Sequence, residues 1–200
     1  MWCNDYPNDL VAKILKVSNK TIVKCLKAFL KKIVNNYYLS IYKIGGNNCI
    51  VEVDESKFGR RKYNKGHFVD GTWILGMVER SENRKIILIP IMNFKKENIH
   101  RLLRFYIFND TRIYTDGFKS YRGLEDYFIE HQFVNHKKEY KVKNTDIHTN
   151  TIEANWSVLK RIIKPKYRTL KRILSFLVKF MVKRNEKGNC FINLFKYYFN

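Results

Sequence analysis

The spacing of apolar residues changes at the segment Gly-Gly-Asn-Asn, residues 45–48. Before this segment, residues 8–34 place apolar side chains three and four positions apart, which is the period of an amphipathic helix. After it, short apolar runs bounded by turn residues predict strands at 49–54, 72–79 and 85–92. We therefore expect an α/β domain preceded by a helical segment.

The elements that follow the three strands also have a defined order. They are a helix, a short strand, a second helix, a strand and two closing helices, at residues 93–108, 111–115, 118–127, 131–135, 150–164 and 170–184. Turn residues at Glu82 and Asn83 favour a hairpin between the second and third strands. The order βββαβαβα predicts a mixed sheet with helices packed on it.

The helical segment at residues 8–34 divides near residues 17–21, Val-Ser-Asn-Lys-Thr. Ser18 or Asn19 can cap a second helix, so the segment predicts two helices joined by a short turn. In a helix-turn-helix, the start of the second helix faces DNA. The candidate DNA-binding residues there are Lys20, Thr21 and Lys24. An ordinary helical hairpin has the same pattern and is the alternative.

The basic residues are unevenly distributed along the chain. The 200 residues contain 39 Lys and Arg against 18 Asp and Glu, a formal net charge of +21 at pH 7. Residues 1–43 hold 8 basic and 2 acidic side chains, residues 44–136 hold 15 and 12, and residues 137–200 hold 16 and 4. Basic ends around a near-balanced middle indicate a nucleic acid as the partner. An anionic lipid surface is disfavoured, because no segment combines a wide apolar face with interfacial anchors.

Several classes of protein are excluded by what the chain lacks. The longest apolar run, residues 86–92, is far shorter than the roughly 20 residues that cross a bilayer. The first residues do not resemble a secretory signal, so we expect an intracellular protein, in the nucleus of a eukaryote or in the cytoplasm or nucleoid of a bacterium. The four cysteines are isolated, which argues against a zinc site and against a disulfide framework.

Three carboxylates occupy positions from which they can converge. Asp54 is expected at the end of the first strand, Asp116 at the end of the fourth, and Glu153 in the first turn of the following helix. Divalent cations between such groups would relieve their repulsion, and oxygen ligands favour Mg²⁺ or Mn²⁺ over zinc. Two such ions roughly 4 Å apart activate a water or a 3′ hydroxyl at a phosphodiester. Each acid also has a local explanation: a strand end, an Asp-Gly turn, and a capping box with Asn150.

Basic residues accompany the three acids. Lys160 follows Glu153 by seven residues, two helical turns, so both side chains project from the same side of the helix. The segment 57–67 suits phosphate contacts, with Phe58 and Tyr63 among its cations. Its candidate DNA-binding residues are Lys57, Arg60, Arg61, Lys62 and Lys65, and Arg161 next to Lys160 is a further one. A solvated basic loop is the simpler interpretation of this segment, and a structural role is the simpler one for His136 and His148.

Five separate motifs occur in one order along the chain. They are VEVDESKFGRRKYNKG at 51–66, WILGMVER at 73–80, YTDGFKSY at 114–121, VNH at 134–136 and HTNTIEANWSVLKR at 148–161. Together they resemble the ISXO2-like (IS1595-type) transposase domain over about residues 45–190. The zinc ribbon of many relatives is missing. The resemblance implies an RNase H-like fold, a DDE-type carboxylate triad of Asp54, Asp116 and Glu153, and Lys160 as the accompanying base.

The resemblance also implies a function and a division of the chain. We expect Mg²⁺-dependent cleavage and joining of DNA strands, acting on transposon ends and target DNA, by a homodimer or larger assembly. The expected divisions are a helix-turn-helix at 1–43, the catalytic domain at 45–190 and a C-terminal tail at 191–200. The alternatives are a domesticated or inactive protein that binds DNA without cutting it, and a ribonuclease H acting on RNA–DNA hybrids.

Overall fold

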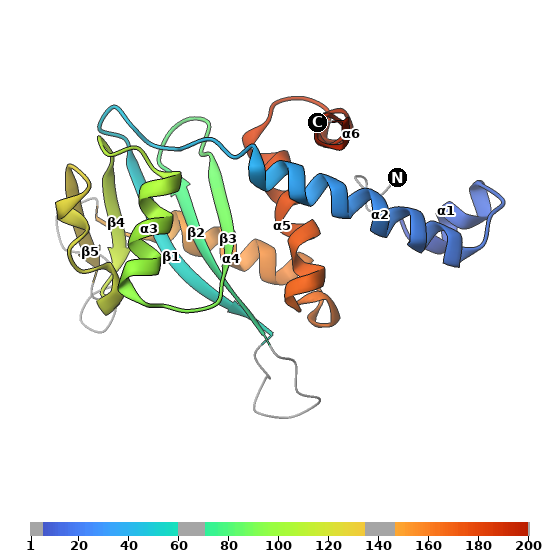
Figure 1. Cartoon of the computed structure of the whole chain (residues 1–200), viewed down its shortest axis with the longest axis horizontal. Coiled ribbons are helices and arrows are strands. Elements are labelled where there is room, and N and C mark those ends of the chain that lie inside the picture. Colours follow the sequence, from blue (N-terminus) through green and yellow to red (C-terminus); the bar gives the residue numbers. More distant parts are fainter. Residues whose placement is uncertain (1–5, 60–70, 135–146, 200) are drawn as a thin grey trace. The chain divides into compact units, whose positions relative to one another are not determined.

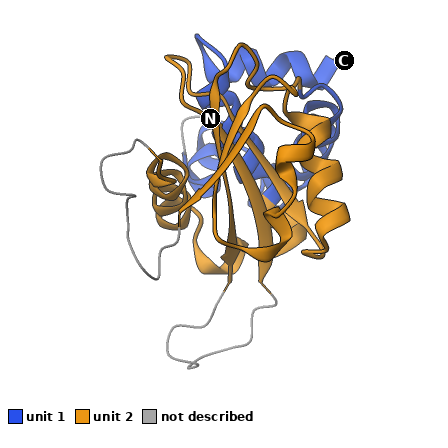
Figure 2. Cartoon of the chain, turned by 90° about the vertical axis from the view of Figure 1, so that its left-hand side faces the viewer, with its two compact units in different colours: residues 1–41, 174–200 blue, residues 42–173 orange. Residues whose placement is uncertain are grey.

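The computed structural model describes residues 6–59, 71–134 and 147–199. The chain forms two compact units, one of residues 42–173 and one in which residues 1–41 combine with 174–200; Figure 2 colours them orange and blue.

The larger unit is built on a five-stranded mixed sheet with the strand order β3-β2-β1-β4-β5. Its strands are β1 Ile50–Phe58, β2 Thr72–Glu79, β3 Ile86–Ile91, β4 Arg112–Asp116 and β5 Glu130–Val134. The first three form an antiparallel meander, whereas β4 pairs in parallel with β1 and β5 in parallel with β4. This topology confirms the expected RNase H-like fold.

Helices cover both faces of the sheet. Figure 1 shows α3 (Lys96–Tyr106) in front of the strands and α4 (Asn150–Ile162) behind them. The apolar side of each helix supplies buried residues, Ile99 and Leu103 from α3 and Ile152 and Leu159 from α4. Burying these stripes on the apolar strands is the main stabilising term of the unit.

The first strand is longer than the sequence analysis expected. Strand β1 continues past residue 54 to Phe58, because each residue from Val51 to Phe58 pairs with β2 in antiparallel register. Asp54 therefore lies in the middle of the strand, and the prediction that it ends the strand is wrong. The alternation of apolar and polar residues stops near residue 54, so the sequence pattern does not predict that the strand continues.

The expected helix over 118–127 is also absent. Two short 3-10 turns, Lys119–Tyr121 and Leu124–Asp126, replace it. Gly123 lies between them with φ 88°, in the left-handed region where a regular helix cannot continue. Tyr121 and Leu124 are nevertheless buried, so the turns supply the apolar contacts that the pattern predicted.

The smaller unit is helical. It contains α1 Asn8–Ile14, α2 Asn19–Leu39, α6 Cys190–Phe199 and most of α5 Leu170–Asn185. Ser18 caps α2 as expected, since its hydroxyl accepts a hydrogen bond from the Thr21 backbone N–H at 3.1 Å. Within the described ranges, no helix combines the length and the apolar character needed to cross a membrane.

Most of the residues expected as a tail over 191–200 belong to the helix α6, Cys190–Phe199. Tyr197 stacks edge-on against Tyr37 of α2, with ring centroids 4.9 Å apart, and Asn36 donates a side-chain hydrogen bond to the Tyr197 carbonyl at 2.9 Å. Tyr198 likewise packs on Phe29 at 5.0 Å. The aromatic residues near the C-terminus thus complete the core of the smaller unit.

Candidate active site

Strand β1 presents Asp54 to the face of the sheet that α4 covers. The indole Nε1 of Trp156, on α4, donates a hydrogen bond to Asp54 Oδ2 at 2.9 Å. Trp156 also meets the Phe58 ring edge-on, with centroids 6.1 Å apart. The position of Asp54 is therefore set by a side chain from a helix about one hundred residues further along the chain.

Gly76 of β2 makes this approach of α4 feasible. It pairs with Asp54 across the strands. A Cβ at position 76 would lie 2.6 Å from the Trp156 ring and 2.8 Å from Ile152 Cδ1. A side chain there would push α4 away from the sheet, so a glycine is required for the close contact.

Asp116 ends β4, as the sequence analysis expected. Its Oδ1 accepts a hydrogen bond from the Phe118 backbone N–H at 3.0 Å, which closes a local turn after the strand. The neighbouring Thr115 hydroxyl bonds to the Asp116 carbonyl at 2.7 Å and lies 3.0 Å from His131 Nε2. Hydrogen bonds from Thr115, before Asp116, and from Phe118, after it, thus fix the backbone at the end of β4.

Glu153 lies in the first turn of α4, also as expected, and is exposed. The residue that precedes the helix is Thr149, and its hydroxyl donates to Glu153 Oε1 at 3.0 Å. Asn150 is the first residue of the helix, so the capping box proposed for Asn150 and Glu153 is replaced by a contact with Thr149. A carboxylate in this turn is stabilised by the helix dipole.

The charges of Asp116 and Glu153 act on the Asp54 carboxylate. Burial raises the pKa of Asp54 to about 6, the Trp156 hydrogen bond opposes that rise, and the negative charges of Asp116 and then Glu153 add to it. Carboxylates raise each other's pKa only at short range, because water and salt screen distant charges. The charges of Asp116 and Glu153 therefore reach Asp54.

A fourth carboxylate, Glu55, was missed by the sequence analysis. Burial raises its pKa to about 7, and the charges of Asp116 and Asp54 contribute to that rise. The hydroxyl of buried Tyr121 donates to Glu55 Oε2 at 2.5 Å and opposes the rise. The signal was present, because Asp54 and Glu55 are consecutive acids in a strand.

Glu52 and Arg80 are further residues that were not singled out. Glu52 is fully buried, pairs with Arg80 Nε at 2.6 Å and accepts the backbone N–H of Ile152 at 2.9 Å. Arg80 in turn donates to the carbonyl of His148 at 2.6 Å. These bonds tie the start of α4 to β1, which fixes the turn that carries Glu153. His148 thus has a structural role here.

Lys160 lies close to Asp54, two turns after Glu153 on α4. Burial lowers the pKa of Lys160, the Asp54 carboxylate opposes that effect, and Arg168 adds to it. The ammonium Nζ is 5.8 Å from the centroid of the Phe58 ring. Arg168 also donates to the Lys160 carbonyl at 2.5 Å and to the Ile163 carbonyl at 2.9 Å, which holds the end of the helix.

The remaining candidate DNA-binding residues are placed in different parts of the chain. Lys57 is exposed near the end of β1, with Nζ 5.6 Å from the centroid of the Trp73 ring, and Arg161 is exposed in the last turn of α4. Lys20 and Lys24 line a depression of about 440 Å³ on α2 in the smaller unit, and Thr21 bonds to Ser18. Arg60, Arg61, Lys62, Lys65 and His136 lie outside the described residues.

The donor chemistry of the site fits a hard divalent cation. Its side chains offer carboxylate oxygens, and their mutual repulsion is the kind that Mg²⁺ relieves. Among residues 6–59, 71–134 and 147–199, no three His, Cys, Asp or Glu side chains already stand at the spacing of a bound metal ion. The charges of Asp116 and Glu153 affect Asp54, but the described carboxylates do not stand at the distances of a metal-coordination site.

The family model described as the ISXO2-like transposase domain matches residues 43–195. The chain belongs to this family. Among solved structures, the chain is similar to the catalytic core domain of BIV integrase, with 11% identity, 75% of this chain and 95% of that chain covered, and a TM-score of 0.44. No curated protein matches the sequence.

Proposed function

We propose that this ISXO2-like domain cleaves DNA strands and transfers them to target DNA in a Mg²⁺-dependent reaction. The partners are the ends of a mobile element and the target duplex, and the protein acts wherever that DNA resides. Two ends must be held together for such a reaction, so the working form is a homodimer or a larger assembly.

The observation that carries the proposal is the position of Asp54, which lies on β1 and accepts a hydrogen bond from Trp156 of α4, the helix that also carries Glu153 and Lys160. Asp54 has its pKa raised to about 6, and Asp116 and Glu153 are the charged residues that add to the effect of burial. Asp54, Asp116 and Glu153 would hold Mg²⁺, or Mn²⁺ in its place. When bound, the metal would supply Lewis-acid activation and charge stabilisation at the phosphodiester.

The protein's own residues orient the reactants. Trp156 fixes one oxygen of Asp54, and the bonds of Glu52 and Arg80 to the start of α4 fix the turn that carries Glu153. Lys160, next to Asp54, contacts a DNA phosphate and so holds the reacting strand. Lys57 and Arg161 add phosphate contacts beside the site, and Lys20, Thr21 and Lys24 contact the duplex through the smaller unit.

The reaction consists of two displacements at phosphorus. In the first, a water oxygen bonds to the phosphorus and the bond to the 3′ oxygen breaks, which leaves a 3′ hydroxyl. In the second, that hydroxyl attacks a phosphodiester of the target strand and releases its 3′ oxygen. Neither displacement needs a covalent bond to the protein.

The test is an Asp116→Asn variant assayed for Mg²⁺-dependent nicking and strand transfer on duplex DNA. Loss of one carboxylate charge should abolish both activities, while DNA affinity measured in Ca²⁺ stays within about twofold of wild type. Asp126→Asn is the matched control, because Asp126 is an exposed acid in a 3-10 turn outside the triad, and it should keep full activity.

Two outcomes would overturn the proposal. Unchanged nicking by Asp116→Asn would remove Asp116 from the chemistry. DNA binding by the wild type without nicking in either Mg²⁺ or Mn²⁺ would instead support a domesticated DNA-binding protein.

A further inference from the structure

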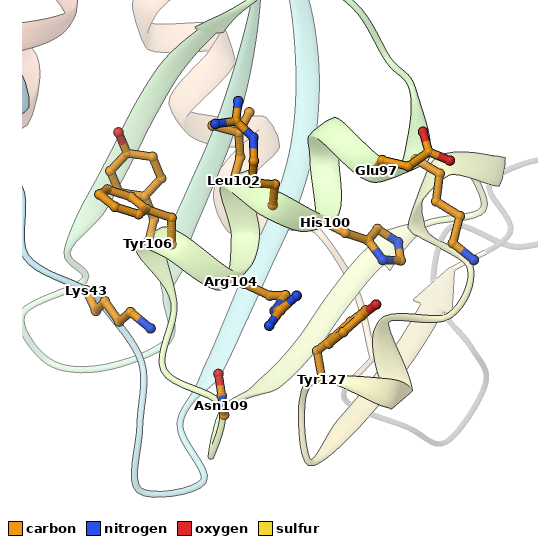
Figure 3. Close-up of a pocket in the computed structure, with 11 residues that line it drawn as sticks. Lys43, Glu97, His100, Leu102, Arg104, Tyr106, Asn109 and Tyr127 are labelled. Carbon is orange, nitrogen blue, oxygen red and sulfur yellow. The ribbon is translucent and has the colours of Figure 1, made fainter.

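A groove on the outer side of α3 lies apart from the triad. It encloses about 890 Å³ and is lined by residues from Lys96 to Tyr106 of α3 together with Lys43, Asn109 and Tyr127 (Figure 3). None of the triad residues lines it. The proposed function makes no use of this surface.

The groove is strongly basic. It is lined by one acid, Glu97, and by four cations, Lys43, Lys96, Arg101 and Arg104. None of these cations forms an ion pair with a carboxylate in the part of the chain that the structure describes. Figure 3 shows Arg104 extending from α3 toward Tyr127, with Glu97 near the other end of α3. The carboxylates of the described residues therefore do not neutralise the positive charge of the groove through ion pairs.

Aromatic rings hold two of these cations in place. The guanidinium of Arg104 lies 4.6 Å from the centroid of the Tyr127 ring, and Lys43 Nζ lies 5.8 Å from that of Phe108. A cation placed over a ring keeps its full charge and its N–H donors toward solvent. The rings thus position the charges without cancelling them.

His100 of α3 forms part of the wall of the groove. The residue is only 6% exposed, and its Nε2 has no hydrogen-bond partner among the described residues. Burial lowers the pKa of His100 and the Lys96 charge lowers it further, whereas the Ser120 backbone and the charges of Asp126 and Glu97 oppose that effect. The ring stands edge-on to Tyr127 with centroids 5.5 Å apart.

The spacing of the cations suits an extended anion rather than a single small one. Lys96 and Arg104 are eight residues apart on a helix that rises about 1.5 Å per residue, so their attachment points are about 12 Å apart. Measured along the duplex axis, one strand of B-DNA carries three or four phosphates over about that length, with an axial rise of about 3.4 Å each. A lone phosphate would need the cations to converge on one point.

We infer that this α3 groove binds the phosphate backbone of a DNA duplex, as a contact separate from the triad. The choice of DNA as the polyanion rests on the proposed function, whereas the charge and spacing of the groove do not. Backbone contacts of this kind position a duplex without reading its sequence. The expected binding is therefore sensitive to salt and indifferent to sequence.

The test measures affinity of the full chain for a random-sequence duplex against salt concentration, in EDTA so that no cleavage intervenes. Each phosphate contact contributes about 0.9 to the slope of log K against log salt. Arg101→Gln/Arg104→Gln should therefore flatten the slope by about 1.8, and Arg101→Lys/Arg104→Lys should leave it unchanged. The matched control is Lys85→Gln/Arg122→Gln, which removes two exposed cations outside the groove and should leave the slope unchanged.

A second measurement follows amine acetylation of individual lysines. The duplex should protect Lys43 and Lys96 but not Lys85, and Asp116→Asn should show the same protection, since the binding does not depend on catalysis. Equal slope changes in the groove and control variants would overturn the inference. So would protection by inorganic tripolyphosphate without protection by the duplex, which would indicate a small-anion site. Failure of nicking alone would affect only the proposed function.

Discussion

At the scale of the residue, the decisive feature is the Asp54 carboxylate, whose ionised form is disfavoured by burial and by nearby negative charges. Asp54 lies in the middle of β1, bonded to Trp156 and close to two other acids. Burial and like charges both favour the protonated form, and a bound divalent cation favours the ionised one. The ionised Asp54 carboxylate thus destabilises the folded, metal-free protein at neutral pH.

The stability of the metal-free protein should therefore fall as pH rises from about 4 to about 7. The pKa of Asp54 is about 6 against an ordinary value of 3.8, so the folded state binds more protons than the unfolded state in this window. For Asp54 the difference corresponds to at most about 3 kcal/mol. Glu55, with a pKa of about 7, acts in the same direction. Urea unfolding in EDTA at pH 5 and pH 8 measures the effect.

The Asp54→Asn variant isolates the contribution of this residue. Asparagine keeps an oxygen for the Trp156 N–H and has no charge, so its unfolding free energy should decline less between the two pH values. Mg²⁺ added at pH 8 should stabilise wild type and stabilise this variant less. An identical pH and Mg²⁺ response in both proteins would contradict the electrostatic account, and Asp126→Asn serves as the control.

At the scale of the element, α4 carries most of the site. The seven-residue interval between Glu153 and Lys160 predicted that both side chains project from one side of the helix, and both residues lie on α4, two turns apart. The sequence could not show which residues position α4 on the sheet. Glu52, Gly76 and Arg80 lie on or next to strands distant in sequence from α4, and they contact it or the residues just before it only in the folded protein.

Substitution of Gly76 by alanine should displace α4. The new methyl group would lie 2.6 Å from the Trp156 ring, and overpacking of this kind costs about 1–3 kcal/mol. We expect a matching loss of unfolding free energy and a fall in Mg²⁺-dependent nicking of at least tenfold, because Glu153 and Lys160 move with the helix.

The stability control for Gly76 is Gly117→Ala. A Cβ at position 117 would meet only the Val134 carbonyl, at 3.9 Å, which is an ordinary contact. Its unfolding free energy should stay within about 0.5 kcal/mol of wild type. Equal stability of the two variants would show that α4 does not depend on close approach at Gly76.

At the scale of the whole molecule, the two ends of the chain form one unit. Helices α2 and α6 share the contacts of Tyr37 with Tyr197 and of Phe29 with Tyr198. The Tyr197 hydroxyl also donates to Glu186 at 2.7 Å. The larger unit has its own core around the sheet, so the two units should open independently.

A Tyr197→Ala variant tests that independence. Loss of the ring and its hydrogen bond should cost about 2–3 kcal/mol, which corresponds to roughly 30- to 150-fold faster amide exchange in α2. Exchange at Val34 and Tyr37 should therefore accelerate, while exchange at Val53 in β1 stays unchanged. The matched control is Tyr42→Ala, because that ring is 87% exposed. Equal acceleration at Val53 would mean that the chain opens as a single unit.

The amino-acid sequence by itself determined the order of the strands and the two N-terminal helices with their Ser18 cap, and it singled out the three acids proposed for the site, because hydrophobic period, caps and residue type are local properties. It misplaced Asp54 at a strand end, predicted a helix where Gly123 prevents one, and left the C-terminal residues as a tail. Only the tertiary structure decided the length of β1, the coupling of Glu55 to the triad and the groove on α3. Each of these depends on strand pairing, burial or charge proximity between residues distant in the chain, and such long-range contacts leave no periodic trace in the sequence.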